Sequence, residues 1–275
     1  MKTVVNINAV ELLFENEQTI DTSSLEASMK KHCGAAELAE REREASAWHF
    51  FFPDKTVEYA EGKLPAQCLI TPPDLKGKAR DFSSSLQQTW QWPGAEKAVQ
   101  KCSTSLLVTD VMASGLDYKV RVELFKGILQ ATLENVDCVA INWKTTEQFI
   151  DPHEFIACQK KSNIQSYLWG FINVRLFNIA DSEDIIMDTL GLATLGLPDL
   201  QCHFRVLEPN DIARTLWNLA FYIYENGDVI QDGHTVPGVK PEQKWKCQHE
   251  MSILEPERVV LDINPGPSYA AGNRE

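Results

Sequence analysis

The stretch that decides the fold is "SLLVTDVMASGLDYKVRVELFKGILQATLE", residues 105–134. Its first nine residues are mostly apolar and read as a buried strand. From about residue 116 to 134, apolar side chains recur with the period of 3.6 residues that one face of a helix shows. The residues that give this period are Val120, Leu124, Ile128 and Leu129, with Phe125 and Leu133 beside them. A buried strand followed by a long amphipathic helix predicts a sheet with helices packed against it.

Shorter elements precede this stretch. We expect strands at 9–16, 47–54 and 66–73, and helices at 22–33, 36–45 and 92–102. The helix at 36–45 is predicted from its helix-forming residues with alternating charge, which are typical of a solvated face. Over the first 112 residues the elements can be written strand, helix, strand, strand, helix, strand. This order suits a ferredoxin-like, split βαβ sheet with its helices on one face.

The elements after the stretch suggest a further α+β unit. We expect strands at 138–143, 166–179, 246–254 and 258–263, a strand–turn–strand at 184–207, and helices at 152–160 and 211–226. The predicted fold class is therefore α+β, with mixed or antiparallel sheets and helices packed mainly on one face. The predicted organisation is an N-terminal half at 1–112, a C-terminal half at 113–263 that shares a continuous core with it, and a mobile tail at 264–275.

Composition limits the classes of partner. The 275 residues carry a net charge of -13 and have no long basic stripe, so we expect no nucleic acid as partner. No window approaches 18 uninterrupted apolar residues, so we expect no membrane span. Seven scattered cysteines without a CxxC pair and a poor signal peptide predict a cytoplasmic protein with free thiols. No metal-binding spacing or nucleophile motif is present, so we predict no metal ion and no cofactor.

One segment has the composition of an active site. The residues "YENGDVIQDGHTVPG" at 224–238 hold Glu225, Asp232 and His234 among three glycines and a proline. Gly227 follows a periodic apolar run and predicts the end of a helix, and "DG" at 232–233 predicts a hairpin turn. We therefore expect backbone geometry to account for most of the segment. Glu225, Asp232 and His234 stay as candidates for a binding or acid–base site if the fold brings them together.

Tryptophans give a second set of candidates. Trp90 and Trp92 lie outside predicted regular structure and either anchor a loop on the core or present aromatic area to a partner. Trp143 ends the predicted strand 138–143. Trp169 and Trp217 fit core positions. Trp90, Trp92 and Trp143 therefore join Glu225, Asp232 and His234 as candidate binding residues.

The chain resembles a known family over roughly residues 47–238. The shared features are a proline-rich strand end, a "WPxA" helix start, an apolar strand followed by a long helix, and a later "ENGxVIxDGxT" motif. In this sequence the two motifs are Trp92, Pro93 and Ala95, and Glu225, Asn226, Gly227, Val229, Ile230, Asp232, Gly233 and Thr235. The family is the bacterial domain of unknown function 4261. The chain departs from it at "PP" (72–73) and in the run "AELAEREREA" (36–45).

The resemblance implies a bacterial accessory protein of the cytoplasm, since some similar proteins are encoded near secretion and toxin genes. No catalytic residue of this chain can be assigned from the resemblance. Together with the acidic charge, the resemblance favours a non-enzymatic interaction protein, for example an immunity or adaptor protein that binds a toxin or secretion-associated partner. A basic partner would complement the acidic charge. Two alternatives stay open. One is an enzyme with a site around Glu225, Asp232 and His234, and the other is a sensor of a small ligand.

Overall fold

The computed structural model describes residues 6–39, 47–72, 81–240 and 242–272. The chain forms two compact units, each with its own sheet. One unit comprises residues 7–170, and the other comprises residues 1–6 and 171–275. The fold is α+β, as predicted. The predicted boundary after residue 112 falls inside the first unit, because β1 (Ala9–Phe14) pairs with β5 (Thr104–Val111) before this boundary and with β6 (Ala140–Trp143) after it.

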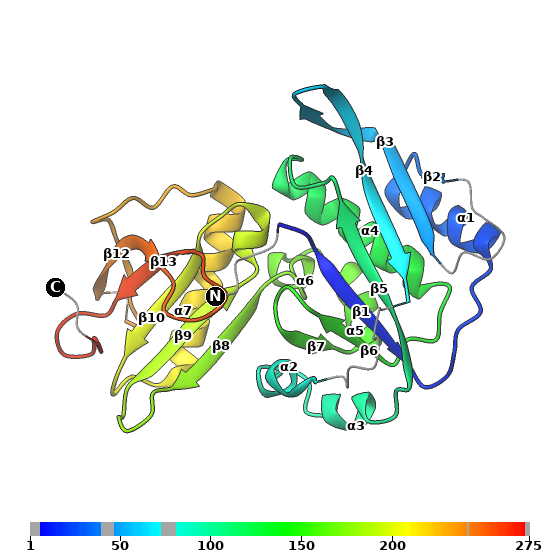
Figure 1. The fold of residues 1–275 in the computed structure, drawn as a ribbon. Coiled ribbons are helices and arrows are strands. Elements are labelled where there is room, and N and C mark those ends of the chain that lie inside the picture. The colour runs from blue at the N-terminus through cyan, green and yellow to red at the C-terminus, as the bar shows by residue number, and fades with distance from the viewer. Residues whose placement is uncertain (1–5, 40–46, 73–80, 241, 273–275) are drawn as a thin grey trace. The chain divides into compact units, whose positions relative to one another are not determined.

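The first unit is built on a seven-stranded sheet in the order β2-β3-β4-β5-β1-β6-β7 (Figure 1). All pairings recorded in it are antiparallel. In a ferredoxin-like, split βαβ order, β1 would lie between β4 and β5. Here β1 instead lies between β5 and β6, so the predicted ferredoxin-like order is wrong. The strands are β1 (Ala9–Phe14), β2 (Glu37–Leu38), β3 (Trp48–Tyr59), β4 (Gly62–Thr71), β5 (Thr104–Val111), β6 (Ala140–Trp143) and β7 (Gln148–Ile150).

Helices cover both faces of this sheet. On one face Trp143 of β6 lies against Phe125 of α4 and Phe155 of α5, with ring centroids 6.0 and 6.1 Å away. On the other face α3 packs its Ala95 and Val99 into a cluster of buried side chains from the sheet. The helices are α1 (Thr22–Cys33), α2 (Ser83–Gln87), α3 (Ala95–Val99), α4 (Tyr118–Leu133), α5 (Pro152–Gln159) and α6 (Ile164–Tyr167).

Local sequence explains where the long helices begin. The Asp117 carboxylate accepts hydrogen bonds from the backbone N–H groups of Lys119 and Val120, which caps the first turn of α4. Asp151 caps α5 in the same way, and Pro152 occupies the first helical position, where its missing N–H costs nothing. The helix predicted from the periodicity at 116–134 is therefore confirmed, to within two residues at each end.

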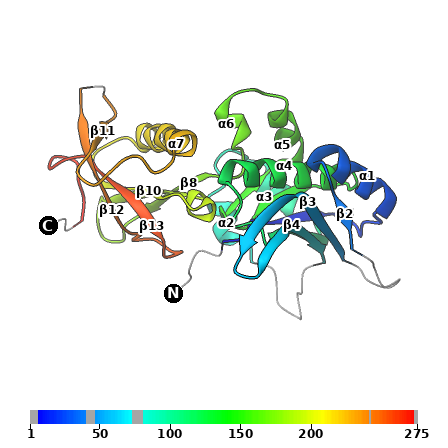
Figure 2. The ribbon, with the colours of Figure 1, turned by 90° about the horizontal axis from the view of Figure 1, so that it is seen from above.

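The second unit is built on a six-stranded sheet in the order β11-β12-β13-β10-β9-β8. The pairings are antiparallel except for β10 with β13. Helix α7 packs against β8, β9 and β10 on one face (Figure 2). The elements are β8 (Asn173–Asn178), β9 (Ile185–Leu190), the short 3-10 helix η1 (Leu192–Leu195), β10 (Asp199–Phe204), α7 (Pro209–Asn226), β11 (Thr235–Pro237), β12 (Lys244–Met251) and β13 (Val259–Asn264).

Helix α7 shows the clearest agreement between pattern and fold. Its side chains Ile212, Leu216, Ala220 and Ile223 are buried along one face, as the periodicity of 211–226 predicts. Gly227 ends the helix with φ +81°, a conformation that favours glycine. The hairpin that was expected directly after α7 is not formed. Asp232 and Gly233 form a turn, but β11 pairs with β12 rather than with residues 229–231, so no hairpin closes on this turn.

Three further predictions differ from the structure. Residues 37–38, expected in a helix, form strand β2, and the rest of that predicted helix, 40–45, lies outside the described residues. The long strand expected at 166–179 is a helical turn followed by β8. Within the tail expected at 264–275, residues 269–271 are bonded to the end of β10, because the Arg205 N–H donates to the Tyr269 carbonyl and the Ala271 N–H donates to the His203 carbonyl; residues 273–275 lie outside the described residues.

Gly170 explains why the expected strand breaks. Its φ is +94°, and its carbonyl accepts hydrogen bonds from the side chains of Thr146 and Gln148. A Cβ at this position would lie 2.3 Å from the buried Trp143 ring. The chain therefore turns at residue 170 against the tryptophan, and only glycine fits there.

We predict that Gly170→Ala destabilises the first unit by about 3 kcal/mol, because it adds a steric clash to an unfavourable φ. Gly62→Ala is the control. Its φ is also positive, +131°, but open space surrounds the position, so it should cost only about 1 kcal/mol. Urea unfolding measures both variants, and hydrogen exchange assigns the loss to residues 7–170. Equal losses in the two variants would contradict the close contact with Trp143.

Candidate functional site

A buried network of four charged side chains lies in the second unit. Arg175 of β8 and Asp188 of β9 are cross-strand partners, and the Arg175 Nη2 lies 2.6 Å from the Asp188 Oδ2. Arg258, just before β13, donates to the same Asp188 oxygen at 2.5 Å and from its Nε to Asp199 of β10 at 3.0 Å. All four side chains are at most 2% exposed. Removing ions from water is costly, so each must be compensated by partners.

Arg258 is fully compensated. Its Nη1 donates to the carbonyls of Leu254 and Pro256, and its Nη2 also donates to the Thr189 carbonyl at 2.8 Å. With the bonds to Asp188 and Asp199, every one of its five N–H donors has an acceptor. The guanidinium is therefore a structural group that fixes the segment before it, and it has no donor left for a ligand.

Asp199 organises the neighbouring turn. Its carboxylate accepts a hydrogen bond from the Thr189 hydroxyl at 2.9 Å and from the Leu192 N–H at 3.0 Å, at the start of η1. Complete burial raises the pKa of the Asp199 carboxyl above its usual value, and the Arg258 guanidinium opposes this shift. The turn between β9 and β10 is thus attached to the same network as the loop between β12 and β13.

That loop, residues 252–258, and the strand ends on either side of it carry exposed apolar side chains. Met251 is 52% exposed, Ile253 is 58% exposed and Val259 is 51% exposed. Met251 and Val259 face each other across β12 and β13. We call these three residues the loop surface. The loop beneath it is held by the Arg258 side chain, by the bond from the Ile253 N–H to the Gln201 side chain and by bonds between Ser252 and Arg258.

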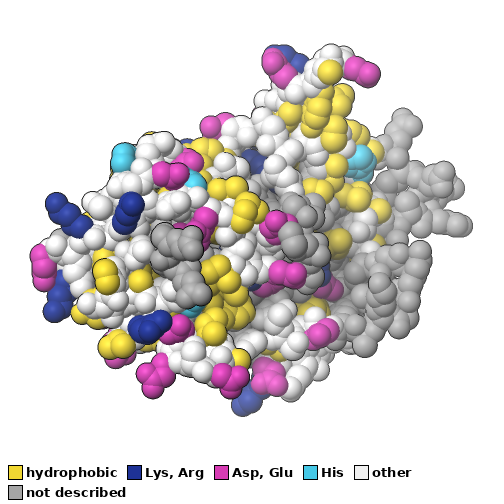
Figure 3. Space-filling model, turned by 60° about the vertical axis from the view of Figure 1, so that its left-hand side comes forward, with side chains coloured by type: hydrophobic (Ala, Val, Ile, Leu, Met, Phe, Trp, Pro, Cys, Tyr) yellow, Lys and Arg dark blue, Asp and Glu magenta, His cyan; other side chains and the backbone are white. Residues whose placement is uncertain are grey.

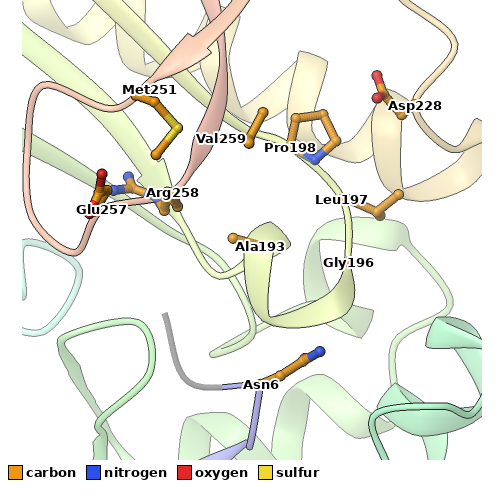
Figure 4. Close-up of a pocket in the computed structure, with 10 residues that line it drawn as sticks. All are labelled: Asn6, Ala193, Gly196, Leu197, Pro198, Asp228, Met251, Glu257, Arg258 and Val259. Carbon is orange, nitrogen blue, oxygen red and sulfur yellow. The ribbon is translucent and has the colours of Figure 1, made fainter. Parts of the chain in front are cut away.

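A cavity of about 470 Å³ opens beside the loop surface. Figure 4 shows Met251, Val259, Pro198 and Leu197 side by side along it, with Glu257 at one end and Asp228 at the other. The remaining lining residues are Asn6, Ala193, Gly196 and Arg258. The volume is in the range of ligand and side-chain binding pockets, and an apolar row of this kind suits an apolar group.

A second hollow, of about 590 Å³, lies on the sheet face opposite α7 and has a polar lining. Lys246, Gln248 and Glu250 of β12 point to it, with Asp262 and Asn264 of β13. Its floor is fixed by Gln201, whose amide nitrogen lies 3.1 Å from the Glu250 carboxylate and 3.4 Å from the Asp262 carboxylate. Met251 and Ile253 also line this hollow, so the loop surface forms part of its wall.

His249 stands between two carboxylates at the outer side of β12. Its Nδ1 lies 2.8 Å from Asp232 Oδ1 and its Nε2 lies 3.1 Å from Asp228 Oδ1. The Asp232 carboxylate also accepts the His249 backbone N–H, which lowers the pKa of Asp232. Partial burial lowers the pKa of His249, but the hydrogen bonds and charges of Asp232 and Asp228 outweigh it, so the net shift is upward. Protonated His249 thus ties the segment after α7 to β12.

The structure separates the acid–base residues that the sequence singled out. Asp232 contacts His249, not His234. His234 is exposed, and its Nδ1 accepts a hydrogen bond from the Gln231 N–H at 3.2 Å. No ion pair joins His234 to an acid among the described residues. Glu225 is exposed at the end of α7. The three side chains therefore do not form the cluster that an acid–base site would need.

The candidate tryptophans differ in accessibility. Trp90 is 42% exposed, Trp92 is half-buried against the cluster that holds α3, and Trp143 is fully buried. Trp169 and Trp217, expected in the core, are half-buried. Of the three candidates, Trp90 presents the most surface, and Trp143 has a packing role between α4 and α5.

Two findings concern metals and membranes. Within the described ranges, no group of three or more His, Cys, Asp or Glu side chains is arranged to hold a metal ion. Among the helices of these same ranges, none has the length and apolarity needed to cross a membrane.

Sequence reasoning missed the loop surface. Met251, Ile253 and Val259 lie in or next to stretches that were predicted as strands, where apolar residues are expected to be buried. A signal was present in "EPER" at 255–258, a charged segment between two apolar strands. Nothing in the sequence shows that Arg258 turns inward and leaves the flanking apolar residues outside.

Comparison with known proteins supports the family resemblance. Residues 188–264 match the family model of domain of unknown function 4261. The match runs from Asp188 to the end of β13, so it includes Asp199, Arg258 and the loop surface. It contains the "ENGxVIxDGxT" motif, whereas the "WPxA" motif lies outside it. No curated protein and no solved structure matches the chain.

We predict that Asp188→Asn destabilises the second unit by about 3 to 5 kcal/mol, because Arg175 and Arg258 lose a shared buried counter-charge. Asp211→Asn is the control, since Asp211 pairs with the exposed Arg214 and should contribute less than about 1 kcal/mol. Urea unfolding with hydrogen exchange over residues 171–272 measures both. A loss below 1 kcal/mol for Asp188→Asn would show that the network contributes little to stability.

We also predict a pH-dependent contribution from His249. A histidine whose pKa is raised by folding stabilises the protein below its ordinary pKa of 6.5, and this stabilisation is lost as pH rises through the folded pKa. His249→Gln should therefore lower the unfolding free energy more at about pH 6 than at about pH 8.5. The control is His234→Gln, which removes an exposed imidazole that forms no ion pair with an acid among the described residues and should lower the unfolding free energy less than His249→Gln does at about pH 6. A pH-independent effect of His249→Gln would refute the ionic bridge.

Proposed function

We propose that the protein is a non-enzymatic interaction protein of the bacterial cytoplasm that binds a protein partner through the loop surface. The observation that carries the proposal is the exposure of Met251, Ile253 and Val259 on a loop that is held from beneath by buried ions. Apolar groups that are exposed together on a rigid support are typical of binding surfaces, because little entropy is lost when a partner covers them.

The surroundings of the loop surface support a protein partner. Asp228 and Glu257 lie at the ends of the adjacent cavity, and Glu250 lines the hollow on its other side. An apolar centre with a charged rim is the usual anatomy of a protein interface. Figure 3 shows one face of the molecule, on which hydrophobic side chains gather with Asp and Glu side chains next to them.

The family resemblance narrows the class of partner. The resemblance implies an accessory protein of a kind that is in some cases encoded near secretion and toxin genes, so we propose an immunity or adaptor role in which the partner is a toxin or a secretion-associated protein. The alternative of an enzyme site around Glu225, Asp232 and His234 has no support from the geometry, since Asp232 pairs with His249 instead.

Co-expression with the products of neighbouring genes tests the proposal. We expect one of them to co-purify in a stoichiometric complex and, if it is toxic, growth to be restored. Met251→Asp should weaken the complex at least about tenfold, because it places a charge at the centre of the buried contact.

Val206→Asp is the matched control. Val206 is 78% exposed in the same unit but lines neither cavity, so the variant should bind as the unaltered protein does. Failure of every neighbouring product to bind would argue against an interaction role. A complex that Met251→Asp leaves intact would place the interface elsewhere on the protein.

A further inference from the structure

We infer that the partner segment that fills the cavity beside the loop surface carries an apolar side chain flanked by Lys or Arg residues. The inference rests on the proposed function and adds the chemistry of the partner. It is drawn from three features of the cavity: an apolar row, a carboxylate at each end, and an arginine whose charge is already neutralised.

The apolar row defines the central contact. Met251 and Val259 are each about half exposed, and Pro198 and Leu197 continue the row along the cavity wall. Leu197 is 8% exposed. A polar side chain placed here would lose its hydrogen bonds to water without replacement. An apolar side chain would instead gain from covering the exposed parts of Met251 and Val259.

The two ends of the row carry negative charge. Glu257 stands at one end and Asp228 at the other, with the apolar side chains between them (Figure 4). Glu257 has no ion-pair partner within the described part of the chain. Asp228 shares its Oδ1 with His249, and its side chain is 43% exposed. Both carboxylates are therefore accessible to a cation brought by a partner.

Arg258 does not offset these charges. Although it lines the cavity, its guanidinium is 2% exposed and is surrounded by Asp188, Asp199 and three backbone carbonyls. Its charge is balanced by two carboxylates inside the unit. The field at the cavity is thus set by Glu257 at one end and, at the other, by Asp228 with its neighbours His249 and Asp232, a cluster that stays net negative even when His249 is protonated. This field favours a segment with a positive charge on each side of its apolar residue.

Selection from a library of random linear peptides tests the inference. The full chain is the bait, and peptides that also bind the Met251→Asp variant are discarded. We expect the remaining sequences to be enriched in an apolar residue with Lys or Arg on both sides. The inference would be overturned if the selected peptides were acidic or uncharged, or if no selected peptide depended on Met251 for binding.

Charge reversal of the rim gives a second measurement on a selected peptide. Glu257→Lys and Asp228→Lys should each weaken its binding about 3- to 10-fold, and added salt should weaken it further. Val206→Asp should leave the affinity unchanged. If both reversals leave it unchanged, the carboxylates do not select the partner and the inference fails.

The failure of this inference is distinguishable from the failure of the proposed function. If Met251→Asp abolishes binding of a co-expressed partner but both charge reversals leave it bound, the proposed interaction role is supported. The inference that the partner segment carries flanking Lys or Arg residues is then refuted. Sedimentation of the chain alone tests the remaining possibility, that a second copy of the chain fills the cavity. A dimer that Met251→Asp dissociates would show that a second copy fills the cavity, and would overturn the inference.

Discussion

The contact of Arg258 with Asp188 and Asp199 is the interaction on which the second unit depends. Strands β9 and β10 and the loop at 252–258 all supply acceptors to this one guanidinium, and the turn at η1 donates to the same Asp199 carboxylate. Such ions are costly to bury, so any displacement of the loop would leave a charge without compensation. The network therefore fixes one position for the loop, and with it the positions of Met251, Ile253 and Val259 outside.

This rigidity connects stability to the proposed function. A surface that is ordered before it meets a partner loses less conformational entropy on binding. The same loop forms the wall of two cavities with different character, one apolar with acidic ends and one polar. The matched family segment, 188–264, contains the two aspartates, Arg258 and the loop, but not Arg175. The part of the network that lies within the matched segment is thus the part that holds the loop.

The elements with strong periodicity were predictable. Helices α4 and α7 and strands β1, β5 and β13 follow from apolar spacing, and the caps at Asp151 and Gly227 follow from residue type. The strand order was not predictable, because pairing of β1 with both β5 and β6 depends on contacts about a hundred residues apart. The break at Gly170 was also missed, since it depends on the Trp143 ring lying against the turn.

The sequence by itself determined the α+β class, the main helices, the acidic charge and the family resemblance, because these depend on local pattern and composition. The candidate site was decided by tertiary structure alone. Asp232 and His234 are two residues apart in sequence, yet Asp232 bonds to His249, seventeen residues away. Arg258 and Val259 are adjacent, yet one is buried among carboxylates and the other is exposed. Which side of a strand faces the core is set by the partners across the sheet, and local sequence pattern does not show which strands become partners.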